Sequence, residues 1–127
     1  FEVDSGAVSR RRVFAQFPVK TADQALAGYG GRPDGAAVDA EGGYWVAMFE
    51  GSRVLRLTPD GRVERELPLP VRCPTMPCFG GADLKTLYIT SSRENRPGDE
   101  LSRQPLAGCV LQVRVDVAGL PANVAKA

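Results

Sequence analysis

Hydrophobic residues along the chain come in short runs, and turn-forming residues separate one run from the next. The 14 glycines and 10 prolines supply many of these interruptions. Short apolar runs bounded by Gly and Pro are typical of strands, whereas a helix needs a longer run with a period near 3.6 residues. The pattern therefore predicts an all-β fold.

The clearest local pattern is a hairpin. Residues 53–58 and 62–67 alternate apolar and charged positions on either side of Pro59-Asp60-Gly61, which has the composition of a turn. Each of these two strands should therefore bury one face. Residues 44–49 are apolar throughout, which predicts a strand buried on both faces.

The strand pattern also repeats. Residues 44–47 align with 87–90, and residues 53–57 align with 109–113 when the polar stretch 93–107 is treated as an enlarged loop. A repeating unit of four strands is typical of a propeller blade. We therefore expect about two and a half blades of one propeller domain over residues 1–127: outer strands of one blade in 1–20, a whole blade in 30–70 and most of the last blade in 72–118.

Two and a half blades cannot close a ring. The chain should expose sheet faces and at least one strand edge, and such surfaces promote association. We expect it to self-associate or to pair with a missing N-terminal half. The absence of an initial Met fits a piece of a longer protein.

The charge balance excludes several classes of partner. With 16 basic and 15 acidic residues the net charge is +1, so the sequence predicts neither nucleic-acid binding nor attachment to an anionic membrane. No apolar run is long enough to cross a bilayer, and the first residues lack the pattern of a signal peptide. Three cysteines, an odd number, argue against a disulfide framework and favour the cytoplasm.

The chain contains no histidine, which removes the commonest general base and transition-metal ligand. Chemistry must therefore rest on carboxylates, amides and hydroxyls, or on a hard cation that prefers oxygen ligands.

Pro33-Asp34-Gly35 is the tripeptide of most interest, although Pro59-Asp60-Gly61 has the same letters and reads as a turn. Its context differs, because it comes just before the small-residue strand 36–38. The innermost strand of a propeller blade lines the central channel, so Asp34 should point into that channel, where its carboxylate suits a hard cation. Thr75 and Met76, on the next inner strand, and Phe49 are candidates for the wall of a substrate cavity.

Three other segments favour a structural reading. Residues 28–33 neither spell a dinucleotide fingerprint nor open a helix, so they read as a loop between strands. Cys73 and Cys78 lack further Cys or His partners and should be buried, inert thiols. Residues 93–107 should form a solvated surface loop, in which 99–103 could make one helical turn. A role for this loop as a lid over the cavity is the alternative.

Taken in order, the motifs of this chain resemble those of the family of senescence marker protein (regucalcin), gluconolactonase and luciferin-regenerating enzyme. The segments that carry the resemblance are Gly31–Gly35, Val38–Gly42, Trp45–Ala47, Gly51–Arg56, Pro59–Gly61, Cys78–Gly81, Leu87–Ser91, Arg103–Gly108 and Gly119–Pro121. The resemblance covers nearly the whole chain.

The resemblance implies a six-bladed β-propeller with one divalent cation, calcium or zinc, held in the channel by a Glu, an Asn and an Asp. Asp34 matches the Asp, while the Glu and the Asn would precede Phe1. It further implies metal-dependent hydrolysis of a small-molecule sugar lactone with Asp34 as a metal ligand. By its chemistry, the Asp34 carboxylate could also accept a proton from the metal-bound water and so act as general base. This chain would supply only part of that active site and would be inactive alone.

Two other functions stay open from the sequence. The protein could be a calcium-binding regulatory propeller, in which the metal site matters more than turnover. It could also be a non-catalytic interaction propeller, in which Asp34 is only a turn residue.

Overall fold

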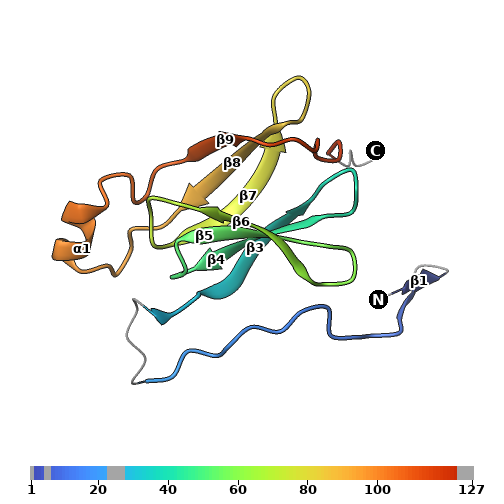
Figure 1. Cartoon of the computed structure of the whole chain (residues 1–127), viewed down its shortest axis with the longest axis horizontal. Helices are drawn as coiled ribbons and strands as arrows, with labels where there is room; N and C mark the ends of the chain where they lie inside the picture. The colour runs from blue at the N-terminus through green and yellow to red at the C-terminus, as the bar shows by residue number, and fades with distance from the viewer. Residues whose placement is uncertain (1, 5–6, 23–27, 123–127) are drawn as a thin grey trace.

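The computed structural model describes residues 2–4, 7–22 and 28–122. This part of the chain forms antiparallel strands and a single helix of six residues, which confirms the predicted all-β fold (Figure 1). The elements are β1 (Glu2–Asp4), β2 (Ala7–Ser9), β3 (Arg32–Val38), β4 (Tyr44–Phe49), β5 (Arg53–Leu57), β6 (Val63–Pro68), β7 (Pro74–Gly80), β8 (Thr86–Ser91), α1 (Gly98–Arg103) and β9 (Leu111–Arg114).

Each larger sheet is a meander, in which neighbouring strands follow one another along the chain. The four-stranded sheet has the order β3-β4-β5-β6, the three-stranded sheet has the order β7-β8-β9, and β1 pairs with β2. All of these pairs are antiparallel, which allows short connections between strands. The two larger sheets are therefore two copies of one structural unit.

The pairing register carries the same repeat as the sequence. Val46 on β4 faces Leu55 on β5, and Ile89 on β8 faces Leu111 on β9. The alignment of residues 44–47 with 87–90 and of 53–57 with 109–113 puts these two pairs in equivalent positions, so the predicted repeat is confirmed.

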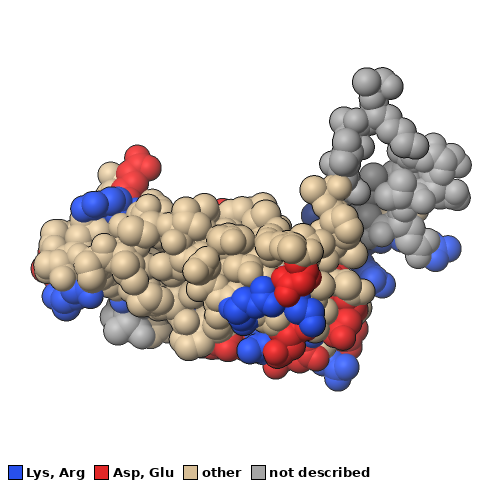
Figure 2. Space-filling model, turned by 90° about the horizontal axis from the view of Figure 1, so that it is seen from above, with Lys and Arg blue, Asp and Glu red and all other residues tan. Residues whose placement is uncertain are grey.

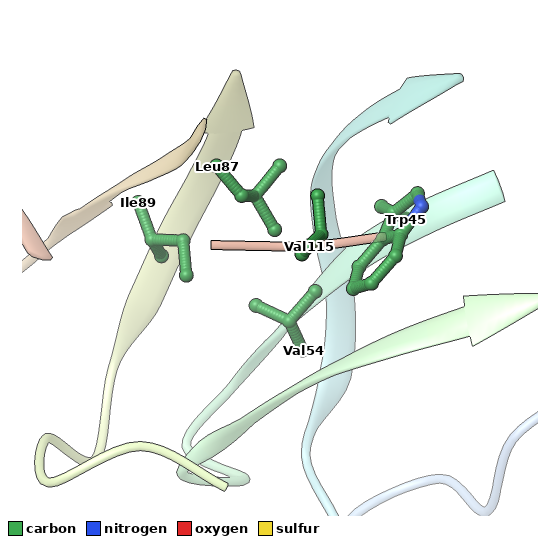
Figure 3. Close-up of a cluster of buried hydrophobic side chains, with 5 residues drawn as sticks. All are labelled: Trp45, Val54, Leu87, Ile89 and Val115. Atoms are coloured by element: carbon green, nitrogen blue, oxygen red, sulfur yellow. The ribbon is translucent and has the colours of Figure 1, made fainter. Parts of the chain in front are cut away.

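The main core lies between the two larger sheets. Trp45 and Val54 from the first sheet pack with Leu87 and Ile89 from the second, and Val115 completes the cluster (Figure 3). All five side chains are buried. Full burial of a side chain of this size contributes about 1.5–3 kcal/mol, so this cluster is a main source of the attraction between the sheets.

A second cluster covers the other face of the first sheet. Val46, Met48, Leu55 and Leu57 are buried there, because the irregular segment before β3 passes over them and contributes partly buried Ala15 and Phe17. Phe14 meets Tyr44 edge-on, with ring centroids 5.5 Å apart. β4 is consequently buried on both faces, as the sequence predicted.

The prediction that β5 and β6 would each bury one face was wrong for both strands. β5 is buried on both faces, because Arg56 points to a buried carboxylate on the core side. β6 is exposed along most of its length, because it is the outermost strand of the sheet. Its charged side chains suit an outer edge, where they oppose pairing with other strands.

The buried carboxylate is that of Asp39, in the turn between β3 and β4. Its Oδ1 accepts hydrogen bonds from the backbone N–H groups of Glu41 (3.0 Å) and Gly43 (2.8 Å). Its Oδ2 accepts from Trp45 Nε1 (2.8 Å) and Arg56 Nε (2.7 Å). A charge that is this deeply buried is tolerated only when partners replace its water, and here four donors do so.

The same turn also binds the C-terminal segment. Asp39 forms an isolated antiparallel bridge with Gly119, and the Ala40 N–H donates to the carbonyl of Ala118 at 2.8 Å. The segment after β9 is therefore held against the first sheet.

β3 and β7 approach each other closely. A Cβ added to Gly35 on β3 would overlap the Met76 sulfur on β7 and would lie 2.7 Å from the carbonyl oxygen of Thr75. Only glycine therefore allows the two backbones to come so near.

No helix among the described residues is long and apolar enough to span a membrane.

Replacing Asp39 by Asn should lower the free energy of unfolding by about 3 kcal/mol near neutral pH, because Arg56 loses its buried anionic partner. Burial alone would raise the pKa of Asp39, but hydrogen bonds from Arg56, Trp45 and Gly43 outweigh it and lower the pKa. The stabilisation is therefore complete above the unfolded-state pKa of about 3.9 and is lost as the pH falls through the lower folded-state value.

Urea unfolding at one chain concentration, repeated at several pH values, measures this effect. The difference between wild type and Asp39→Asn should shrink once the pH drops below about 4. Asp116→Asn is the control, because Asp116 makes only an exposed ion pair with Arg65 and should matter little. A difference that stayed constant down to acidic pH would show that the charge of Asp39 is not what stabilises the turn.

Replacing Gly35 by Ala should destabilise the chain by about 1–3 kcal/mol, because the Thr75 carbonyl is backbone and cannot move aside as a side chain can. Gly98→Ala is the matched control, since an added Cβ at Gly98 meets nothing within 4 Å. Equal thermal unfolding temperatures for the two variants would contradict the close approach of β3 and β7.

Candidate functional site

The first strands of the two larger sheets, β3 and β7, lie side by side. Each stands at the start of its sheet, and Gly35 on β3 contacts the Thr75–Met76 backbone on β7. The equivalent strands of two successive meander units thus share one edge. In a propeller this edge faces the central channel.

Both strands carry a β-bulge at the same level. Pro33 faces Met48 and Ala36 faces Val46, so Asp34 and Gly35 together oppose the single residue Ala47. On β7, Pro74 faces Ser91 and Met76 faces Thr90, so Thr75 is the additional residue. A bulge redirects the side chain of the extra residue away from the regular alternation of the strand, and bulges are frequent next to active sites.

Asp34 lies within β3, whereas the sequence pattern placed it just before a strand of residues 36–38. β3 begins at Arg32, because Arg32 and Pro33 already pair with Phe49 and Met48 on β4. The Pro33-Asp34-Gly35 tripeptide has the composition of a turn because a bulge interrupts the strand at this point.

The carboxylate of Asp34 is exposed and forms no hydrogen bond or ion pair with the part of the chain that the structure describes. Asp60, in the other Pro-Asp-Gly tripeptide, is committed to its own hairpin: it accepts a hydrogen bond from Thr58 Oγ1 and pairs with Arg62 at 2.8 Å. The two tripeptides therefore differ in their surroundings, and of the two carboxylates only that of Asp34 is without a partner among the described residues.

The structure brings three of the four sequence candidates together. Thr75 and Met76 lie beside Gly35, next to Asp34, and the Thr75 hydroxyl hydrogen-bonds the Thr90 hydroxyl at 2.7 Å. Phe49 lies at the end of β4, where the Arg32 guanidinium carbon sits 4.4 Å from its ring centroid. Phe49 thus lies against Arg32.

Sequence reasoning missed a buried acidic residue at this end of the sheet. Glu50, which follows β4, accepts hydrogen bonds from Lys20 Nζ, Arg32 Nη1 and Arg96 Nη1 at 2.9–3.1 Å. We call Glu50, Lys20, Arg32 and Arg96 the Glu50 hub. The only signal in the sequence was an acidic residue directly after an apolar strand, and nothing in it identified three distant cations as partners.

Glu50 stays ionised in this setting. Burial would raise the pKa of Glu50, but hydrogen bonds from Lys20 and Arg96, with the positive charge of Arg32, outweigh it and lower the pKa. The hub is therefore an ion-pair cluster and not a reservoir of protons near neutral pH.

The loop between β8 and β9 is tied to this hub. Arg96 also pairs with Glu100 through Nε (2.8 Å) and Nη2 (2.7 Å), and Glu100 belongs to α1. The predicted helical turn at residues 99–103 is confirmed as α1. Gln104, just after the helix, accepts a hydrogen bond from the Arg72 backbone N–H at 2.7 Å. Although much of the loop is exposed, its base is anchored by buried charges.

The cysteines form no disulfide, and one prediction about them was wrong. Cys73 is buried, and burial raises the pKa of its thiol. Cys78, which was expected to be buried too, is exposed, because it follows Pro77 on β7 and so points away from the core. Cys109 is exposed as well.

The described residues contain no group of three or more His, Cys, Asp or Glu side chains that could hold a metal ion. Asp34 alone offers an uncommitted carboxylate at the edge formed by β3 and β7. A carboxylate is a suitable ligand for a hard cation, so these residues fit one ligand of such a site and not the whole coordination sphere.

Comparison with known proteins identifies close relatives. Residues 1–93 match the model of the SMP-30/Gluconolactonase/LRE-like region. A 6-deoxy-6-sulfogluconolactonase from Pseudomonas putida is 64% identical over 92 residues, which cover 72% of this chain and 32% of the relative. Regucalcin from Oryctolagus cuniculus is 36% identical over 123 residues, 95% of this chain and 38% of the relative. The chain spans roughly a third of the length of these relatives.

Solved structures give the same result. A calcium-binding protein, regucalcin, from Agrobacterium tumefaciens matches with a TM-score of 0.69 and 32% identity, over 73% of this chain and 32% of that protein. A luciferin-regenerating enzyme matches with a TM-score of 0.60 and 32% identity, over 71% of this chain and 30% of that protein. With its repeated meander sheets forming part of a six-bladed β-propeller, the chain belongs to the SMP-30/gluconolactonase/LRE-like family.

Proposed function

We propose that the protein carrying this chain hydrolyses a sugar lactone with the aid of one divalent cation, and that Asp34 supplies one ligand to that cation. The observation that carries this proposal is the exposed, unpaired carboxylate of Asp34 at a bulge of β3, beside β7. An uncommitted carboxylate on the strand that lines the channel is suited to bind a ligand.

The names of the relatives support lactone hydrolysis. The relative from Pseudomonas putida, with 64% identity, is named as a lactonase for a sulfonated gluconolactone. A gluconolactone is therefore the substrate class that we propose, and 6-deoxy-6-sulfogluconolactone is the first compound to test.

The chemistry can proceed without histidine. A bound divalent cation polarises an ester carbonyl and lowers the pKa of a water ligand. Asp34 would bind with one carboxylate oxygen and accept a proton from the attacking water with the other. Thr75 and Met76, which lie beside Gly35, would form part of the cavity wall against the lactone ring.

We propose calcium as the first cation to test and zinc as the second. The related structure from Agrobacterium tumefaciens is described as a calcium-binding protein. Calcium prefers oxygen ligands, and the available donor of this chain is a carboxylate. This description also favours a second candidate function, a regulatory calcium-binding propeller, which the measurement of turnover separates from the first.

We further propose a cytoplasmic location. All three cysteines are free thiols, and two of them, Cys78 and Cys109, are exposed to solvent. Exposed thiols persist in a reducing compartment and are oxidised elsewhere.

We also propose that other blades, or a second copy of the chain, cover the open face of the second sheet. This face carries the exposed side chains of Met76, Tyr88 and Val110, which are 47%, 38% and 62% exposed. Figure 2 shows the molecule from above the view of Figure 1, with a largely uncharged middle and charged side chains mainly toward its ends. Large apolar side chains exposed together on one sheet face are typical of a surface that packs against another sheet.

Asp34→Asn in the complete protein should reduce lactone hydrolysis at least about 100-fold and weaken cation binding, because the amide carries no negative charge. Hydrolysis of gluconolactone and of its 6-sulfo analogue, measured with added calcium, with zinc and with a chelator, gives the turnover. Calorimetric titration gives the metal affinity.

Asp60→Asn is the matched control, since it makes the same change in the same tripeptide at a hairpin turn and should leave both quantities nearly unchanged. Normal hydrolysis by Asp34→Asn with normal metal content would overturn the assignment. If the wild type binds the cation but has no lactonase activity, and Asp34→Asn loses cation binding, the regulatory function is favoured.

The isolated chain should associate at micromolar concentration, and replacing Tyr88 and Val110 together by Lys should convert it to monomers, because charge on this face opposes sheet packing. Sedimentation velocity measures the mass. Val63→Lys is the control, since Val63 is 54% exposed but lies on the outer strand β6. A wild-type chain that sediments as a monomer would exclude a second copy of the chain as the cover of this face.

A further inference from the structure

Glu50 occupies an unfavourable backbone conformation for its side chain. It lies in the turn between β4 and β5 with φ of 65°, in the left-handed region where glycine is the residue with least strain. The next residue is glycine, yet this position carries a long acidic side chain. Such a residue persists when its surroundings compensate the strain, and functional sites are where this occurs most often.

The compensation comes from three cations on three different segments. Lys20 lies in the irregular segment before β3, Arg32 is the first residue of β3, and Arg96 lies in the loop that leads to α1. The side chains of Glu50 and Arg96 are 7% and 9% exposed, so their ion pair is shielded from water. One carboxylate therefore ties together segments that are far apart in the sequence.

The start of β3 also rests directly on the Glu50 turn. A Cβ on Gly31 would lie 2.8 Å from the backbone nitrogen of Gly51, and Arg53 Nε donates to the Gly30 carbonyl at 3.0 Å. The Arg32 guanidinium is held between the Glu50 carboxylate, at 2.9 Å, and the ring of Phe49. The backbone that leads into the Asp34 bulge is thus fixed from both sides.

Asp34 follows Arg32 by two residues, and the intervening Pro33 restricts the backbone further. Its own carboxylate has no partner among the described residues to hold it. Its position is therefore set by the backbone at the start of β3, and the backbone is set by the Glu50 hub.

We propose that Glu50 is a positioning residue for the Asp34 cation site. It acts by fixing the start of β3, and with it the backbone that carries Asp34, through its ion pair with Arg32. This inference rests on the proposed function, because it assigns Glu50 a role toward the cation that Asp34 would bind.

Glu50→Gln in the complete protein tests the inference, because glutamine keeps the shape of the side chain and removes the charge. We expect calcium binding, measured by calorimetric titration, to weaken about tenfold, the scale of losing a residue that orients a metal ligand. Hydrogen–deuterium exchange of residues 32–36 in the metal-free protein should become faster. The matched control is Glu41→Gln, which removes an exposed carboxylate paired with Arg56 at 3.1 Å at the opposite end of the sheet and should change neither quantity.

Arg32→Met is the second variant, for use if Glu50→Gln does not fold. It retains apolar contact with Phe49 and leaves Glu50 paired with Lys20 and Arg96, so it should fold, bind calcium more weakly and show faster exchange over residues 32–36. Combined with Glu50→Gln, its effect on calcium affinity should be less than additive, because both variants break the same ion pair.

The outcomes separate the two proposals. Weaker binding and faster exchange in Glu50→Gln, with binding abolished in Asp34→Asn, supports both. Unchanged calcium affinity in Glu50→Gln, with binding abolished in Asp34→Asn, overturns the role of Glu50 and leaves the proposed function intact. Unchanged affinity in Asp34→Asn overturns both.

Discussion

The buried carboxylate of Asp39 is the interaction on which the fold depends. It closes the turn between β3 and β4, holds the indole of Trp45 in the main core, and neutralises Arg56 on the buried strand β5. The turn that it closes binds the segment around Gly119. Four donors offset the cost of burying one charge at the end of the first sheet where β3 finishes.

The opposite end of the same sheet is organised differently. There Glu50 collects three cations from three segments, and the strand that leaves this cluster carries an acidic residue with no partner of its own. A fully paired carboxylate stabilises the structure, whereas an unpaired one is available to a ligand. Asp39 and Asp34, five residues apart on one strand and its turn, represent these two cases.

The two bulges link the fold to the site. In a regular strand, side chains alternate between the two faces of the sheet. One extra residue in β3 and one in β7 interrupt this alternation at the same level and redirect the side chains of Asp34 and Thr75. Gly35 then lets the two backbones approach until they touch. The geometry of the edge is thus a property of two adjacent sheets and of neither sheet alone.

The sequence by itself determined the all-β class, the repeated unit, the hairpin around Pro59-Asp60-Gly61, the helical turn at 99–103 and the family, because each of these depends on local composition or on the order of motifs. It also identified Asp34 as the acidic residue to examine. Only the tertiary structure decided that β5 is buried on both faces, that Cys78 is exposed and that Glu50 joins Lys20, Arg32 and Arg96. Such features depend on contacts between residues far apart in the chain, and local patterns carry no record of which distant segments will meet.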